Sequence, residues 1–187
     1  MKKTFLIFTL LALFSLAMAA DLINENIQNW TARTSYGNYT QSITAGTVNM
    51  IDCIVSPGAN ASGTGSIGRV QLKASTGILE LPALSSCGTT TFNIAAGGAG
   101  RTVKLQSYNG TTWIDLTTFS GIGTTGATFS FVVNSSSSTT LRLSAPSAAI
   151  YVHDIIVTDY AASTPTISVS SATLSGFTYV YGNGPST

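Results

Sequence analysis

The sequence predicts an all-β protein, built as an antiparallel sandwich or barrel. Short runs that alternate apolar and polar residues recur along the chain and are separated by turn residues. Thr, Val and Ile favour these strands, Gly and Asn favour the turns, and no helix-period segment of useful length follows the N-terminal leader. Many short strands at about ten-residue spacing are typical of sandwiches and barrels. We expect strands near 48–55, 67–73, 77–81, 89–95, 101–108, 111–118, 127–133, 139–144 and 149–158.

Residues 1–20 read as a signal peptide. Lys2 and Lys3 precede an apolar run from Phe5 to Leu16, and a small-x-small cleavage pattern follows at Ala17-Met18-Ala19-Ala20. The run is shorter than the roughly 20 apolar residues that span a bilayer, although an uncleaved membrane anchor is an alternative. We therefore expect a cleaved leader helix, and a mature chain that is secreted or held at the cell surface without a membrane segment of its own.

The charge of the chain is low. Eight basic and seven acidic residues give +1, and removal of Lys2 and Lys3 leaves 6 − 7 = −1. Nucleic-acid binding needs a clustered basic surface, so a nucleic-acid partner is not expected. Charged residues make up 8% of the chain, against about 25% in an average domain. Disorder is also excluded, because it usually combines high net charge with low hydrophobicity.

Cys53 and Cys87 are the only cysteines. An exported chain meets an oxidising compartment, so we expect a disulfide between them, with two buried thiols as the alternative. A bridge that closes a loop of about 35 residues would stabilise the fold by roughly 3–4 kcal/mol.

The clearest local feature is a hairpin around Asn109-Gly110. Alternating runs flank this dipeptide, and both of its residues tolerate the positive φ of a type I′ turn. The predicted register pairs Tyr108 with Thr111, Gln106 with Trp113, Leu105 with Ile114, Lys104 with Asp115, and Val103 with Leu116. One face is then apolar, with Val103, Leu105, Ile114 and Leu116. The other face carries Lys104, Gln106, Tyr108, Trp113 and Asp115, including a Lys104–Asp115 ion pair.

This polar face is the candidate ligand site. Sugar binding needs a flat aromatic ring for C–H stacking and amides or charges for the hydroxyl groups, and Trp113, Tyr108, Gln106 and Lys104 supply both. The alternative is that a loop or the other sheet covers Trp113. A second aromatic cluster is expected from Trp30, Tyr36 and Tyr39.

The order of several segments resembles jelly-roll modules of large secreted bacterial proteins, often those exported through a C-terminal sorting domain. The matching residues are Asn24-Glu25-Asn26 before Trp30, Gly68–Leu72 followed by Gly77–Pro82, Tyr108–Trp113, and Ile150–Val157. The resemblance implies a carbohydrate-binding-like jelly-roll sandwich over 21–160. It also implies a linker at 161–166 and, over the β-prone tail 167–187, the truncated start of an immunoglobulin-like domain. The chain would then be a fragment that continues into further domains.

A structural calcium ion is implied by the same resemblance, because such modules commonly hold one between their first and last strands. Asn24, Glu25 and Asp154 are the candidate ligands, and their oxygen atoms suit a hard cation. The alternative is that they are ordinary polar residues at a sheet edge.

The sequence contains no convincing catalytic motif. The only histidine is His153, whose neighbour Asp154 falls on the opposite face of a strand. No Gly-x-Ser-x-Gly leads into a helix, and the Gly-x-Gly-x-x-Gly at 63–68 precedes a strand where dinucleotide binding requires a helix. We therefore expect a non-catalytic module that binds a polysaccharide or cell-surface glycan. The alternatives are a structural or adhesive spacer without a small ligand, and the accessory domain of an extracellular hydrolase whose catalytic part is absent.

Overall fold

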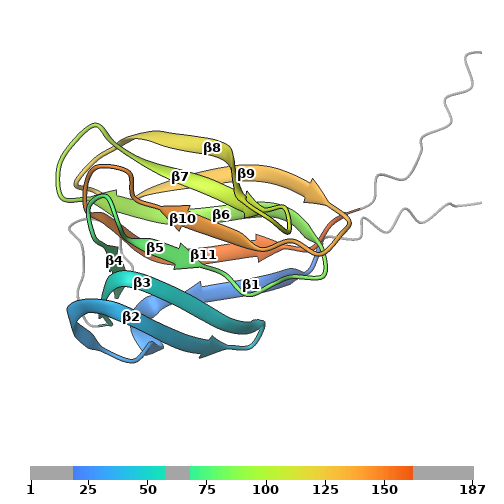
Figure 1. The fold of residues 1–187 in the computed structure, drawn as a ribbon, viewed down its shortest axis with the longest axis horizontal. Coiled ribbons are helices and arrows are strands. Elements are labelled where there is room, and N and C mark those ends of the chain that lie inside the picture. The colour runs from blue at the N-terminus through green and yellow to red at the C-terminus, as the bar shows by residue number, and fades with distance from the viewer. Residues whose placement is uncertain (1–18, 58–67, 162–187) are drawn as a thin grey trace, which may run out of the picture.

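The computed structural model describes residues 19–57 and 68–161, and this part of the chain is an all-β jelly-roll sandwich (Figure 1). One 3-10 turn, η1 (Ile27–Asn29), interrupts the strands. The strands are β1 (Asp21–Asn26), β2 (Arg33–Ile43), β3 (Gly46–Ser56), β4 (Arg69–Leu72), β5 (Ile78–Glu80), β6 (Cys87–Ala96), β7 (Arg101–Tyr108), β8 (Trp113–Ile122), β9 (Ala127–Ser135), β10 (Leu141–Ser144) and β11 (Ile150–Thr158).

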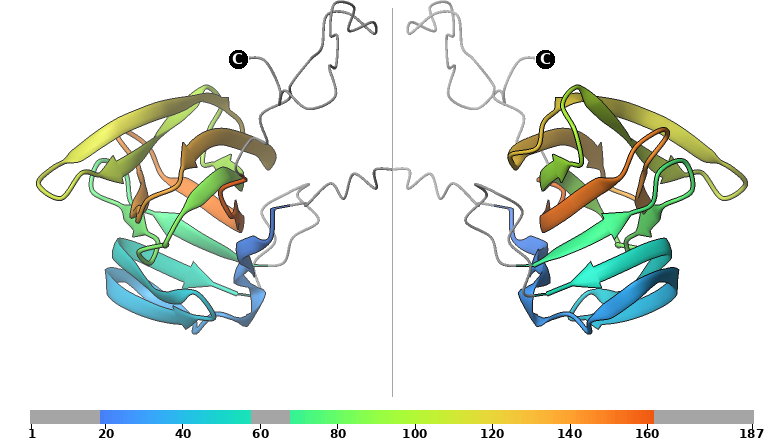
Figure 2. Two further views of the ribbon diagram at one scale, coloured as in Figure 1. Left: turned by 90° about the vertical axis from the view of Figure 1, so that its right-hand side faces the viewer. Right: turned by 90° about the vertical axis from the view of Figure 1, so that its left-hand side faces the viewer.

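All pairings are antiparallel, and the sheet curves around one core (Figure 2). The strand order is β8-β7-β10-β5-β3-β4-β11-β6-β9, with β2 added to β3 and β1 added to β11. β3 connects the strands β8-β7-β10-β5 with the strands β4-β11-β6-β9. Its residues Asn49–Ile51 pair with β5, and its residues Cys53–Ser56 pair with β4. Between these segments Asp52 has a φ of 50°, a left-handed conformation that lets the strand change partners.

Alternating side chains build the core. On β10, Leu141 and Leu143 are buried, whereas Arg142 and Ser144 face outward and are half-buried. The largest fully buried side chains come from strands far apart in sequence: Phe92, Ile27, Leu72, Leu79, Leu81, Ile94, Leu105, Ile122, Leu141, Leu143, Ile150 and Ile155. All nine predicted strands are present, which confirms the sandwich. β1 and β2 were not predicted, and in β2 it is Tyr39 and Ile43 that pack partly against the core.

The hairpin forms, but the predicted two-residue turn is wrong. Tyr108 pairs with Trp113, and the loop between them is closed by the Asn109 side chain. Its Oδ1 accepts the N–H groups of Thr111 and Thr112 at 2.9 and 2.8 Å. A bulge at Leu105/Gln106 then shifts the register. On β7 the predicted apolar face is nevertheless correct, because Val103 and Leu105 are both buried.

On β8 the structure departs from the predicted apolar face at two residues. Ile114 lies near the hairpin end and is 46% exposed, while Leu116 is partly buried against the core. On the polar face the Lys104–Asp115 ion pair is confirmed, with 2.6 Å between Nζ and Oδ2. It is a diagonal contact, because Lys104 lies opposite Thr118 and Asp115 lies opposite Gln106.

The predicted disulfide does not form. Cys53 and Cys87 are both buried free thiols. Along the sheet, Cys53 aligns through Leu72 with Ile150 at the start of β11, whereas Cys87 lies beyond Thr90, which pairs with Val157 near its end. Seven or more residues along a strand correspond to over about 20 Å, and a bridge requires Cα atoms within about 7 Å.

The predicted leader helix and the expected linker and immunoglobulin-like start fall almost wholly outside the described residues. Within 19–57 and 68–161, no helix has the length and apolar character of a membrane span.

Candidate functional site

A row of polar side chains crosses the outer face of five neighbouring strands. Cross-strand pairing places Asp115 (β8) beside Gln106 (β7), Gln106 beside Arg142 (β10), and Arg142 beside Glu80 (β5). Glu80 pairs in turn with Asn49 on β3. Asn49, Glu80 and Arg142 each lie between two buried neighbours on their own strands, so alternation directs them to the outside. Gln106 and Asp115 join them on this face through their cross-strand pairing. We call these five residues, together with Lys104, the polar row.

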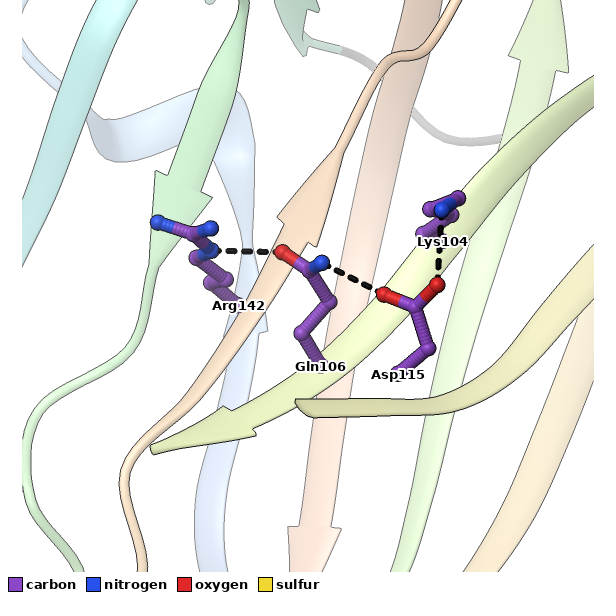
Figure 3. Close-up of polar contacts among 4 residues, drawn as sticks. All are labelled: Lys104, Gln106, Asp115 and Arg142. Atoms are coloured by element: carbon purple, nitrogen blue, oxygen red, sulfur yellow. Dashed lines mark hydrogen bonds and ion pairs between the residues drawn. The ribbon is translucent and has the colours of Figure 1, made fainter. Parts of the chain in front are cut away.

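Hydrogen bonds hold one end of the polar row in a fixed arrangement (Figure 3). The Gln106 Nε2 donates to Asp115 Oδ1 at 2.5 Å, and the Arg142 Nε donates to Gln106 Oε1 at 2.7 Å. Lys104 donates to the other carboxylate oxygen of Asp115. The hydrogen bonds from Lys104 and then Gln106 lower the pKa of Asp115, so this group stays a carboxylate.

Two aromatic rings stand beside the row at the hairpin end. The Tyr108 and Trp113 ring centroids are 5.3 Å apart and tilted by 46°. The Arg142 guanidinium carbon lies 4.1 Å from the centroid of Trp113, a cation–π contact that covers one face of the indole. Burial lowers the pKa of Arg142, while Glu80 and Asp115 raise it. Tyr108 is 43% exposed, so it offers the more accessible ring of the pair.

The opposite end of the row opens into a shallow hollow of about 430 Å³. Asn49 and Glu80 belong to both, and the Asn49 Nδ2 donates to Glu80 Oε1 at 3.2 Å. The remaining lining residues come from β2 and β3: Asn38, Tyr39, Thr40, Met50 and Ile51. Amide, hydroxyl and carboxylate groups therefore line a cavity that continues the row.

The structure brings the four predicted sugar-binding residues, Lys104, Gln106, Tyr108 and Trp113, to one outer face. Sequence reasoning missed Arg142, Glu80 and Asn49. Alternation within β10 and β5 indicates that Arg142 and Glu80 face outward, but only the strand order β7-β10-β5 brings them into line with Gln106.

The expected cluster of Trp30, Tyr36 and Tyr39 does not form one surface. Trp30 is buried, and its Nε1 donates to Glu25 Oε2 at 3.2 Å. Tyr39 packs partly against the core. Tyr36 is exposed and contacts Gln71 through its hydroxyl group at 2.5 Å.

The three predicted calcium ligands are not brought together. On β1, Glu25 turns to Trp30, whereas Asn24 donates to Asp21 Oδ2 at 2.9 Å. Asp154 lies opposite Asn26, and Glu25 lies opposite the buried Ile155. Glu25 and Asp154 thus occupy opposite faces of the sheet. Across residues 19–57 and 68–161, no group of three or more His, Cys, Asp or Glu side chains could hold a metal ion.

Comparison with known proteins gives a likeness in structure only. The sequence matches no protein-family model and no curated protein. Among solved structures, the chain aligns with the CBM22-1–GH10 modules of Clostridium thermocellum endo-1,4-β-D-xylanase 10B, complexed with xylohexaose. The identity is 10% and the TM-score 0.52, over 81% of this chain and 30% of the xylanase chain.

The adhesin domains of Lys-gingipain give a second group of structural neighbours. The K1 domain, from Porphyromonas gingivalis W83, aligns at 13% identity and a TM-score of 0.50, over 73% of this chain and 97% of that domain. The K2 domain aligns at 10% identity and the same TM-score, over 74% and 98%. The described chain therefore shares the β-sandwich fold of these modules.

Proposed function

We propose that this chain is a non-catalytic module of a secreted or cell-surface protein, and that it binds a polysaccharide along the polar row. The observation that carries the proposal is the row itself, beside the exposed ring of Tyr108. Planar amide, carboxylate and guanidinium groups recognise vicinal hydroxyl groups, and an aromatic ring packs against the C–H face of a sugar. The xylanase neighbour, which was solved with xylohexaose, supports this choice of ligand class.

The dimensions of the row favour an oligosaccharide over a monosaccharide. The row and its hollow cross six strands, from β8 to β2. At about 4.8 Å between strands, five intervals give roughly 24 Å. We therefore expect the affinity to rise with the number of sugar units until this length is filled.

The test is isothermal titration calorimetry with a length series of neutral β-1,4-linked xylose and glucose oligomers. Tyr108→Ala removes the exposed ring, and Glu80→Gln removes a charge where the row meets the hollow. Each substitution should weaken binding about two- to thirteenfold, since such contacts contribute about 0.5–1.5 kcal/mol.

Tyr36→Ala is the matched control, because Tyr36 is 37% exposed but contacts Gln71 on β4, away from the row. Binding that is equally strong in Tyr108→Ala and Glu80→Gln would show that the ligand lies elsewhere. No binding to any glycan of a broad array would refute the proposal.

A second candidate function is a structural or adhesive spacer. It is favoured by the way Lys104, Asp115, Gln106 and Arg142 satisfy one another without a ligand. A spacer would bind no glycan on the same array, and Asp115→Asn would lower the stability of the fold without changing any binding property. An accessory role beside a hydrolase predicts that the full-length protein, and not this chain, degrades the glycan bound here.

A further inference from the structure

Four strands of the described sheet are paired on one side only: β1, β2, β8 and β9. Such an edge presents free backbone N–H and C=O groups and can pair with another chain. Proteins commonly block this with charged side chains, proline or bulges. The four edges can therefore be compared by what blocks them.

Three of the edges carry charged side chains. β1 has Asp21 and Glu25, β2 has Arg33, and β8 has Asp115. The β9 edge, Ala-Thr-Phe-Ser-Phe-Val-Val-Asn-Ser, has no charged residue, proline or glycine. Its register is regular from Ala127 to Val132, and the only irregularity lies before Ser135. β9 is thus the least protected of the four.

The side chains of β9 reinforce this difference. Val132 is 65% exposed, the highest value among the large apolar side chains of the described residues. Phe129, Phe131 and Val133 reach the core but remain only partly buried. A strand added beside β9 would cover these side chains and satisfy the backbone groups of the edge together.

We propose that β9 pairs antiparallel with β9 of a second copy of this chain, about a two-fold axis. Such an axis brings a surface against itself, and two antiparallel copies of one strand meet this condition. Without charges, β9 brings no like charges together, whereas the same arrangement at β8 would bring two copies of Asp115 close. The sheet of one copy would then continue through the paired β9 strands into the sheet of the other copy.

The proposed dimer is weak and leaves the polar row uncovered. One strand edge buries far less than the roughly 1,200–2,000 Å² of a stable interface, so we expect dimerisation to depend on concentration in the micromolar range or above. No residue of the polar row belongs to β9. The inference does not depend on the proposed function, but a dimer with two glycan sites would bind a polymer with increased avidity.

Sedimentation velocity over a concentration series tests the proposal. The chain should show a monomer–dimer equilibrium, and Val132→Lys should weaken it at least tenfold. Ile114→Lys is the matched control, since Ile114 is 46% exposed on the β8 edge, and its equilibrium should stay unchanged. Circular dichroism verifies that both variants fold. A monomer at every concentration, or equal effects of the two substitutions, would overturn the proposal.

Amide hydrogen exchange locates the contact independently. In the dimer, alternate N–H groups of β9, those that point away from β6, should gain protection as concentration rises. Protection of the same groups in the isolated monomer would mean that another part of the same chain occupies the edge, and this too would overturn the proposal. Concentration-dependent protection elsewhere, with β9 unchanged, would place the dimer contact on a different surface.

Discussion

Acidification from pH 7 to 5.5 is expected to destabilise the fold through His153. This side chain is fully buried, and its Nδ1 lies 2.7 Å from the Gly68 carbonyl oxygen. A carbonyl only accepts, so Nδ1 carries the proton of the neutral ring. The other nitrogen, Nε2, is buried with no hydrogen-bond partner in the described part of the chain. Protonation would place an N–H group at this unpartnered position.

The direction of the effect follows from the pKa. Burial lowers the pKa of His153 below its usual 6.5, and the nearby Arg69 also lowers it, whereas the hydrogen bond to Gly68 and the charge of Asp154 raise it. Below about pH 6.5 the unfolded chain therefore binds a proton that the folded chain does not. The free energy of unfolding therefore decreases as the pH is lowered through this window, by at most about 1.4 kcal/mol per pH unit. Between pH 7 and 5.5 the upper limit is about 1.3 kcal/mol.

Urea unfolding followed by tryptophan fluorescence, to which the buried Trp30 contributes, measures this loss. The window is specific because the chain has one histidine, and carboxylates titrate near pH 4. His153→Asn retains a donor for Gly68 without titrating, so it should be less stable at pH 7 but nearly independent of pH down to 5.5. A wild-type stability that is constant or rises on acidification would refute the reasoning, as would an unchanged slope in His153→Asn.

Three further predictions concern stability and reactivity. Burial raises the pKa of Cys53 to about 12 and that of Cys87 to about 11. Iodoacetamide at pH 8 should therefore modify neither thiol in the native chain and both thiols in urea, as measured by intact mass spectrometry. Detection of a disulfide-bridged species would contradict this prediction. Asn109→Ala removes the acceptor of two loop N–H groups and should cost about 0.5–1.5 kcal/mol by urea unfolding; an unchanged midpoint would show that the backbone alone closes the loop. Leu143→Ala, in the core between β5 and β7, should cost about 2–5 kcal/mol, whereas Ser144→Ala beside it should stay within about 0.5 kcal/mol; similar losses for both would argue against the assigned faces.

Strands could be predicted where alternation is local. Val103 and Leu105 are buried because they follow a period of two in an uninterrupted run. β2 escaped prediction because it is an edge strand with mostly exposed or half-buried residues, so its sequence lacks an apolar alternation. The turn was mispredicted for a different reason: Asn109 uses its side chain to close a longer loop, a choice that the Asn-Gly dipeptide also permits.

The site could be predicted only where its parts are neighbours in the chain. Gln106 and Asp115 lie on one hairpin, so their proximity follows from the sequence. Arg142 and Glu80 reach the same row through pairings of β10 with β7 and β5, which no local pattern encodes. The Cys53–Cys87 bridge was mispredicted for the same reason, since it also required knowledge of non-local registers.

The distribution of the few cations argues for Tyr108 as the aromatic contact of any glycan. Six basic residues lie outside the predicted leader, and five of them contact a carboxylate or an aromatic ring. One of them, Lys104, pairs with Asp115. Four cover aromatic rings: Arg33 on Tyr39, Arg69 on Tyr151, Lys73 on Tyr36, and Arg142 on Trp113. Tyr108 is exposed, and no described cation lies over its ring. A ligand could therefore stack on Tyr108 without displacing a cation, whereas stacking on the covered face of Trp113 would first require Arg142 to move and its hydrogen bond to Gln106 to break.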